Sequence, residues 1–209
     1  MPTMHSLALF LAAGLALNLT PGPDMLYVAA RGASEGRAAG IVSALGIGVG
    51  TLVHIALVAA GLAALLAAVP VAYLALRLCG AAYLIHLGIR ALRAAPTTTA
   101  IAAPAPASLA VIFRQGVITN VLNPKVALFF LAFLPQFVDA SRGNPALQVV
   151  ALGLLFDASG TLVNLIVALA SSRVAARLRN TSGTTHIIQR ATGVLFIGLG
   201  ARLAYGVRP

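Results

Sequence analysis

The chain has 209 residues, of which 60% are hydrophobic and only 9% are charged. Soluble domains carry about 25% charged residues, so this chain could not cover a soluble surface, and its composition is that of a membrane protein. The formal net charge is +10, but the arginines stand at the ends of apolar runs rather than in a basic patch, which argues against nucleic-acid binding.

Six apolar segments follow one another along the chain, and each is long enough to cross a bilayer as a helix. They cover residues 6–30, 39–67, 71–92, 112–138, 146–171 and 187–206. The Pro-, Ala- and Thr-rich stretch at 94–110 is typical of a flexible linker. We therefore predict an all-α membrane protein of six transmembrane helices, with a three-helix unit over 1–93, a cytoplasmic linker over 94–110 and a second three-helix unit over 111–209.

The two halves share sequence features in the same order. Residues 50–53 (GTLV) in the second segment recur as residues 160–163 in the fifth, while Thr20-Pro21 interrupts the first segment and Asn123-Pro124 interrupts the fourth. Because each half contributes three spans, the second half must cross the membrane in the opposite sense. This predicts a 3+3 inverted-topology repeat with broken helices 1 and 4, a plan common among secondary transporters. Duplication without transport, as in some channels and membrane enzymes, is the alternative.

Arginine counts at the ends of the segments predict the orientation. Nine arginines lie on one side of the predicted membrane, against four on the other. The arginine-rich side faces the cytoplasm in most membrane proteins. Both termini are therefore predicted to be periplasmic, in a multi-pass protein of the bacterial inner membrane. The nine are Arg31, Arg37, Arg90, Arg93, Arg114, Arg173, Arg177, Arg179 and Arg190.

The first segment is broken at Thr20-Pro21-Gly22-Pro23-Asp24. A proline has no N–H and leaves the carbonyl four residues earlier unpaired, here those of Leu17 and Leu19. Such a break persists in hydrocarbon only beside protein or a water-filled cavity, so we expect it to line a site. The half-helix after Pro23 would offer free N–H groups to an anion. Asp24 is either a helix-start residue or a site for a proton or an ammonium ion.

The fourth segment is broken in the same way at Asn123-Pro124. Pro124 frees the carbonyl of Asn120, and the side-chain amides of Asn120 and Asn123 can bridge the freed backbone groups. We therefore predict that Asn120, Asn123 and Pro124 line the same substrate site as the first break.

Lys125 follows this break and lies deep in the predicted membrane, roughly 16 Å of helix beyond Arg114. At that depth the side chain cannot easily reach the interface. Two roles stay open for it. It binds the substrate carboxylate in a partly aqueous cavity, or it forms a structural ion pair with Asp24 or Asp157.

Two further residues are candidates for proton coupling. Asp157 is the only charged residue between Arg142 and Arg173, so it would lie inside the fifth span, where carboxylates usually serve a transport pathway. His54, in the second span, is either a proton-coupling residue or a hydrogen-bonded packing residue.

These motifs resemble those of the LysE/RhtB family of bacterial amino-acid exporters, which includes homoserine, threonine, lysine and leucine efflux proteins. The similar features span nearly the whole chain: residues 19–24 (LTPGPD), the glycine-rich second segment, residues 80–84 (GAAYL) and residues 123–137 (NPKVALFFLAFLPQF). The resemblance implies efflux of amino acids or close derivatives by proton-coupled exchange.

We accordingly predict a secondary transporter, not an enzyme, that needs no cofactor or bound metal. Its partners would be a small amino-acid-like substrate, protons and the lipid bilayer, with a homodimer left open. The half-helix after Pro23, with Lys125, would hold the substrate carboxylate, while the freed carbonyls and Asp24 would hold its ammonium group. Asp24 or Asp157 would release a proton as substrate binds.

A metal-ion exporter of similar architecture is the alternative function. It would need His-rich or carboxylate-rich ligand clusters, and the four scattered histidines argue against it. The single cysteine, Cys79, excludes a thiol-redox carrier that works through a cysteine pair.

Overall fold

The computed structural model describes residues 4–68 and 106–174, together with a few single residues outside these ranges. Within the two ranges the chain is helical and contains no strand. The segments predicted at 71–92 and 187–206, and most of the 94–110 linker, lie outside the described residues. The six-span count and the inverted repeat therefore stay predictions.

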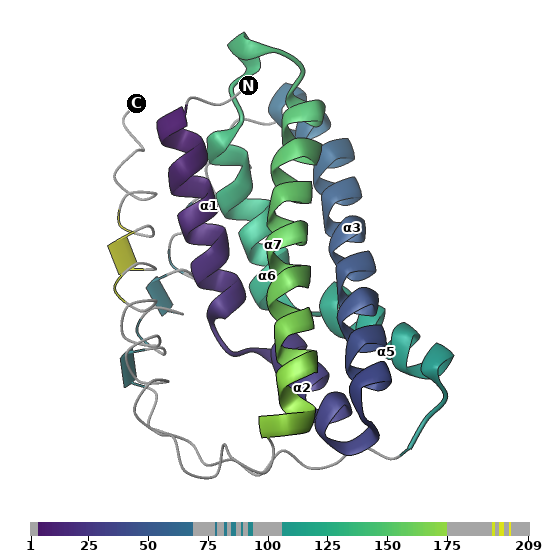
Figure 1. Cartoon of the computed structure of the whole chain (residues 1–209). Helices are drawn as coiled ribbons and strands as arrows, with labels where there is room; N and C mark the ends of the chain where they lie inside the picture. The colour runs from purple at the N-terminus through teal and green to yellow at the C-terminus, as the bar shows by residue number, and fades with distance from the viewer. Residues whose placement is uncertain are drawn as a thin grey trace.

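The first span is broken as predicted. Helix α1 covers Met4–Leu19 and α2 covers Pro23–Glu35, and the two helices meet at an angle of 48° (Figure 1). Pro23 occupies the first turn of α2, where its missing N–H would have had no helical partner. Helix α3, Arg37–Ala68, then runs back along the whole height of the described structure.

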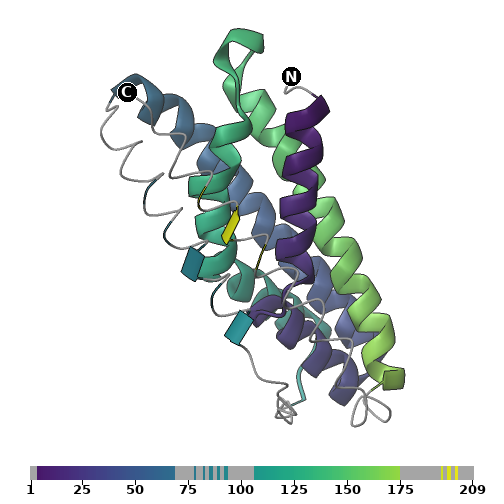
Figure 2. The same cartoon turned by 90° about the vertical axis from the view of Figure 1, so that its left-hand side faces the viewer.

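The fourth span is broken in the same manner. Helix α5 covers Leu109–Val121 and α6 covers Pro124–Leu128, and the chain bends by 45° between them. A π-helical turn η1 at Phe129–Phe133 and a 3₁₀ turn η2 at Leu134–Phe137 continue the second half of this span. A further 3₁₀ turn, η3 at Ala140–Arg142, and helix α7, Pro145–Val174, complete the described part (Figures 1 and 2).

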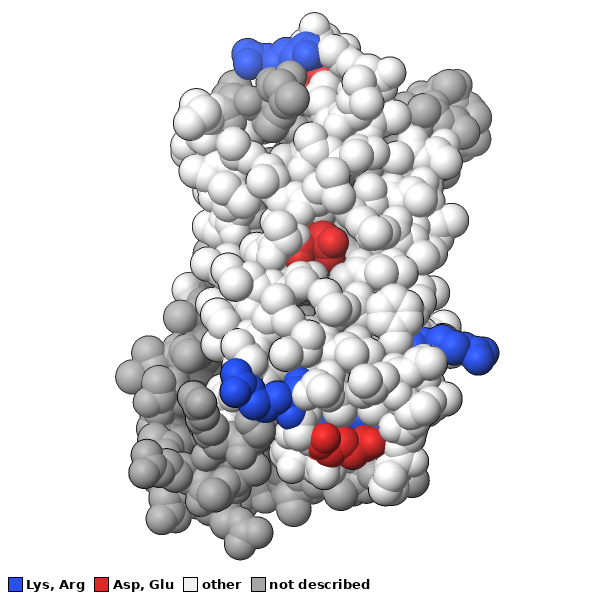
Figure 3. All heavy atoms as spheres, turned by 45° about the vertical axis from the view of Figure 1, so that its right-hand side comes forward, with Lys and Arg blue, Asp and Glu red and all other residues white. Residues whose placement is uncertain are grey.

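Length and hydropathy identify the membrane-crossing elements. Residues Arg37–Gly61 of α3 and Pro145–Ser171 of α7 have mean hydropathies of 2.2 and 1.8 and are long enough to cross a bilayer, and each bent pair passes the same test as one span. The described residues thus contain two spans, or four if both bent pairs cross. One face of the molecule carries its charged groups near the two ends, with a single acidic spot at mid-height (Figure 3). A bilayer requires this distribution of charge.

Glycines on α3 bring it close to α5. A Cβ atom added at Gly46 would lie 2.4 Å from the Phe113 carbonyl oxygen, and one added at Gly50 would lie 2.7 Å from Asn120 Cβ. Real side chains do not come that close, so only glycine permits this packing. Small residues serve this purpose throughout membrane helix interfaces.

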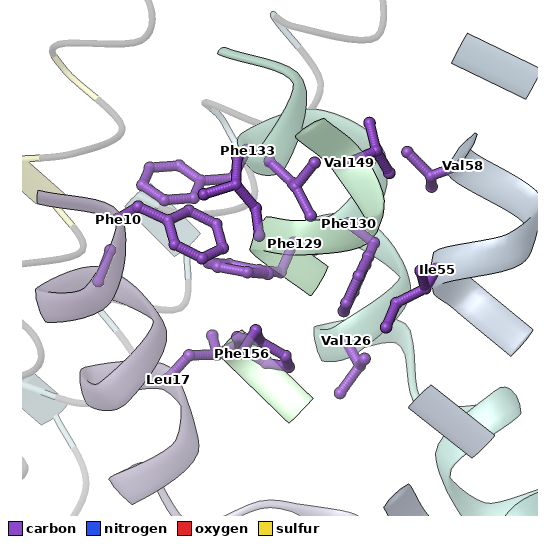
Figure 4. Close-up of a cluster of buried hydrophobic side chains, with 13 residues drawn as sticks. Phe10, Leu17, Ile55, Val58, Val126, Phe129, Phe130, Phe133, Val149 and Phe156 are labelled. Carbon is purple, nitrogen blue, oxygen red and sulfur yellow. The ribbon is translucent and has the colours of Figure 1, made fainter. Parts of the chain in front are cut away.

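An aromatic cluster fills the core between α1, η1 and α7 (Figure 4). The rings of Phe129 and Phe156 stack with their centroids 4.6 Å apart, and Phe10 packs against Phe129 at 5.9 Å. Phe130 and Phe133 belong to the same cluster. These side chains fix α1, the first half of one broken span, and η1, in the second half of the other, against α7.

Candidate functional site

Lys125 connects the two helix breaks. Its Nζ atom donates to the carbonyl oxygen of Leu17 at 3.1 Å and to that of Thr20 at 2.9 Å. Pro21 has no N–H with which to satisfy the Leu17 carbonyl, which instead accepts from the Thr20 N–H at 3.1 Å and from the lysine. A Cβ atom at Gly22 would lie only 3.0 Å from Nζ, so a glycine at this position leaves room for the lysine side chain.

These contacts differ from both roles considered for Lys125. In the part of the chain that the structure describes, neither of the two ion pairs closer than 4 Å includes Lys125 or Asp24. The ammonium group instead binds backbone carbonyls, including the Leu17 carbonyl that we expected to be open to the substrate. An ion pair of Lys125 with Asp24 or Asp157, one of the two roles left open, does not form within 4 Å in this structure.

Asp24 lies in the first turn of α2 with only 8% of its surface exposed. Its Oδ2 atom accepts a hydrogen bond from Asn120 Nδ2 at 2.8 Å, which joins α2 to the end of α5. Its Oδ1 atom is buried without a hydrogen-bond partner, and so is Asn123 Nδ2. The two side chains lie beside each other without a well-formed hydrogen bond between them, which leaves the Asp24 oxygen able to accept from a further donor.

Asn120 is the centre of a second set of contacts, with α3. Its Oδ1 atom accepts from Thr51 Oγ1 at 3.4 Å, and its carbonyl oxygen lies 3.1 Å from His54 Nε2, which must be the protonated nitrogen if it donates there. The His54 ring also stacks on Phe130 with centroids 5.9 Å apart. The structure therefore places His54 beside the site through the Asn120 backbone, with contacts that suit a packing role.

A small cavity lies where α1, α2, α3, α5, α6 and α7 meet. Its volume of about 20 Å³ is room for one water molecule. Asp24 and Asp157 both line it, from α2 and α7. The other lining residues are Asn18, Ile47, Thr51, Asn120, Val126, Phe156, Gly160, Thr161 and Asn164.

Asp157 faces α3 across a glycine. Its Oδ1 atom accepts from Thr161 Oγ1 at 3.4 Å and lies 3.5 Å from the position of a Cβ atom at Gly48. Thr51 lies beside the same carboxylate. Because Thr51 also binds Asn120, a line of polar side chains runs from one carboxylate to the other.

The structure thus brings Asp24, Asn120 and Asp157 to one cavity and places the Thr20–Pro23 break and Lys125 at its edge. Sequence reasoning missed Asn18, Asn164 and the two threonines at 51 and 161 as lining residues. The threonines belong to the repeated GTLV segments, which we used only as evidence of duplication. Asn18 could have been recognised from the sequence, because it is an amide inside an apolar helix. In the structure its Nδ2 atom donates to Ser159 Oγ at 3.0 Å.

A polar network joins α2 to α5 between the cavity and one end of the molecule. Arg31 donates to Gln115 Oε1 at 2.7 Å and forms an ion pair with Glu35. Tyr27 OH donates to the Ile112 carbonyl at 2.8 Å and lies 3.3 Å from the same Gln115 oxygen. Glu35 Oε2 accepts from the backbone N–H of Ala107 at 2.9 Å. We call Tyr27, Arg31, Glu35, Ala107 and Gln115 the Arg31 network, and they close the molecule on this side of the cavity.

A polar cavity at the meeting point of two broken membrane helices is an arrangement that transporters use. Comparison with known proteins leads to the same class. Residues 15–207 match the family of LysE type translocators, so the chain belongs to this family.

The curated relatives cover nearly the whole chain. An uncharacterized membrane protein of Pseudomonas aeruginosa is 34% identical, covering 89% of this chain and 88% of the relative. A leucine efflux protein of Klebsiella pneumoniae is 29% identical, covering 93% and 92%. A leucine efflux protein of Salmonella typhimurium is 28% identical over the same shares. No solved structure matches the chain.

Proposed function

We propose that this protein exports amino acids or close derivatives from the bacterial cytoplasm in exchange for protons. Membership of the translocator family and the relatives named as leucine efflux proteins support a transporter of this kind rather than an enzyme. The observation that carries the proposal is the cavity at the two helix breaks, into which Asp24 and Asp157 both face.

Proton exchange follows from the charges around this cavity. A carboxylate inside a membrane-spanning helix is costly without a positive partner, so a proton or another cation is expected to neutralise part of the charge of Asp24 and Asp157. An ammonium group that enters the cavity supplies the same positive charge and displaces the proton. Asp24 and Asp157 are therefore the proposed coupling residues, while the polar contact of His54 is with the Asn120 backbone.

The proposed substrate carries an aliphatic side chain. Ile47, Val126 and Phe156 form the apolar part of the cavity wall, and burial of apolar surface against them would favour such a side chain by about 25 cal/mol per Å². Leucine is the first candidate, because several relatives are named leucine efflux proteins.

The cavity must open for an amino acid to enter, since it has room for one water molecule only. The Arg31 network lies on one side of the cavity, and the aromatic cluster of Phe10, Phe129 and Phe133 lies on the other. We propose that these two closures open in turn. The side of the Arg31 network would be cytoplasmic, with both termini periplasmic and the chain in the inner membrane.

Two features support the inverted repeat as part of this proposal. The breaks bend their spans by similar angles, 48° and 45°. In addition, the repeated GTLV segments place Thr51 and Thr161 on the same cavity wall. An inverted repeat would supply the two alternative arrangements that alternating access requires.

The test is efflux from liposomes that contain the purified full-length protein. Radiolabelled leucine trapped inside should leave faster when a proton gradient is imposed across the membrane, and Asp157→Asn should abolish this acceleration. Asp139→Asn changes an exposed carboxylate outside the spans and should leave it intact. Leucine efflux that ignores the gradient would contradict proton exchange, and a failure to move any of the twenty amino acids would contradict the function.

The alternative, a metal-ion exporter, is not favoured. Among the described residues, no group of three or more His, Cys, Asp or Glu side chains is placed to hold a metal ion. Transition metals require such groups.

A further inference from the structure

We infer that the site recognises its substrate as a primary ammonium ion with an aliphatic side chain, and that a substrate carboxylate is not needed. This inference rests on the proposed function and specifies the class of substrate. Amino-acid amides and esters, which keep the ammonium group but lack the carboxylate, would therefore be substrates.

The first argument is that the one lysine near the site is already engaged. Lys125 Nζ binds the carbonyls of Leu17 and Thr20 at 3.1 and 2.9 Å, and the side chain is not part of the cavity wall. An ammonium group has three donors, so binding a carboxylate does not by itself require release of the carbonyls. To reach the cavity, however, Lys125 would have to leave both of them. The Leu17 carbonyl would keep the Thr20 N–H at 3.1 Å, but the Thr20 carbonyl would lose the lysine as its donor.

The second argument is that the other anion-binding position holds a carboxylate of the protein. The N-terminus of α2 carries the positive end of the helix dipole, and Asp24 stands in its first turn. A substrate carboxylate placed there would meet the charge of Asp24. The positive end of the α2 dipole is therefore already neutralised by the Asp24 carboxylate.

The third argument is the charge of the cavity wall. Its lining residues include two carboxylates, Asp24 and Asp157, and no lysine or arginine. Asp24 is more than nine-tenths buried, and its Oδ1 atom has no hydrogen bond within 3.5 Å, although the Asn123 amide lies beside the carboxylate. An ammonium group in the cavity would add a charged donor to this oxygen.

Size agrees with this assignment. A cavity of about 20 Å³ accommodates one water-sized group, and an ammonium head is of that size. The apolar residues Ile47, Val126 and Phe156 lie next to it on the same wall. An ammonium head with an aliphatic chain matches both the two carboxylates and the apolar part of the lining.

The experiment compares three ligands on the purified full-length protein in detergent, with the rise in melting temperature as the readout. L-leucine has both charged groups, L-leucinamide has only the ammonium group, and N-acetyl-L-leucine has only the carboxylate. We expect leucinamide to half-saturate the rise at a concentration no higher than leucine does. N-acetyl-leucine should need a concentration roughly ten- to a hundredfold higher, the effect of losing a charged hydrogen bond.

The variant Lys125→Met provides a second measurement, the ratio of the half-saturating concentrations of leucine and leucinamide. A purely structural role of Lys125 would not change this ratio. If Lys125 bound the substrate carboxylate, this variant would weaken the binding of leucine but not the binding of leucinamide. We expect the ratio of the two half-saturating concentrations to stay the same as in the unmodified protein. Should the variant fail to fold, the three-ligand comparison on the unmodified protein still decides.

The outcomes separate the inference from the proposed function. If leucine and N-acetyl-leucine stabilise the protein while leucinamide does not, the inference is overturned and amino-acid export stands. If none of the three ligands stabilises it, the proposal of a leucine-like substrate fails, and this inference fails with it.

Discussion

Lys125 Nζ lies 2.9 Å from the carbonyl oxygen of Thr20, so a cation in one broken span holds the backbone of the other. The two residues are 105 positions apart in the chain. Each break frees backbone groups, and the second break supplies the donor that the first one lacks. The two helix breaks that form the site are therefore also joined to each other by this hydrogen bond.

Replacement of this lysine should destabilise the protein. Lys125→Met keeps the length and apolar stem of the side chain but removes the lysine donor from the Thr20 carbonyl and one of the two donors from the Leu17 carbonyl. An unsatisfied buried group costs about 1–3 kcal/mol, so the melting temperature in detergent should fall by several degrees. Arg114→Met, at an exposed cation on α5, is the matched control and should have little effect.

A double variant distinguishes this reason from an ion pair. If Lys125 neutralised Asp24 or Asp157, the corresponding Asp→Asn change would restore the stability of Lys125→Met. Because Nζ binds carbonyls, we expect no restoration by Asp24→Asn or by Asp157→Asn. Recovery of the original melting temperature in either double variant would contradict the observed contacts.

Gly50→Ala should force α5 away from α3. The added methyl would lie 2.7 Å from Asn120 Cβ and 2.9 Å from the Val117 carbonyl oxygen, and backbone cannot yield cheaply. Such overpacking costs roughly 1–3 kcal/mol, which thermal unfolding in detergent would detect. Transport should fall with it, because Asn120 holds Asp24.

Gly61→Ala is the control in the same helix. Among the described residues nothing lies within 4 Å of the added methyl, so the change should be neutral, or stabilising by up to about 1 kcal/mol through helix propensity. Equal loss of stability in both variants would show that the close approach at Gly50 is not the cause.

Asp24→Asn should abolish proton-driven efflux while the protein stays folded in the membrane. In the unmodified protein Asn120 Nδ2 donates to the Asp24 carboxylate at 2.8 Å. The asparagine of the variant keeps an oxygen that can accept the same hydrogen bond, so the contact between α2 and α5 should survive. The charge and the titratable proton are lost. Efflux of trapped leucine under an imposed proton gradient is the measurement, and full activity at every pH would leave Asp24 a helix-start residue only.

Cysteine labelling tests the orientation. In a background with Cys79→Ser, a cysteine at Ala38, at the start of α3, should react with an impermeant maleimide only from the cytoplasm. One at Ala140, in η3, should react only from outside. Both positions are exposed at opposite ends of the described structure. Labelling of Ala38→Cys by the impermeant reagent in intact cells would contradict the proposed topology.

The sequence by itself determined where the helices break. Proline lacks an N–H in any environment, so Pro21, Pro23 and Pro124 interrupt their helices whatever packs around them. Composition likewise determined the membrane setting, and the family match confirms the resemblance read from the motifs around these breaks. Local chemistry was sufficient for each of these inferences.

Only the tertiary structure decided which groups satisfy the broken backbone. Lys125 binds Leu17 and Thr20, and Asn120 binds Asp24 across 96 residues of chain. The sequence left Lys125 with several acceptable partners, because a charge inside a span accepts any carboxylate or carbonyl that packing brings near it. The close approach of α5 to α3 at Gly50 selects among them, and that approach depends on residues far from Lys125 in the chain.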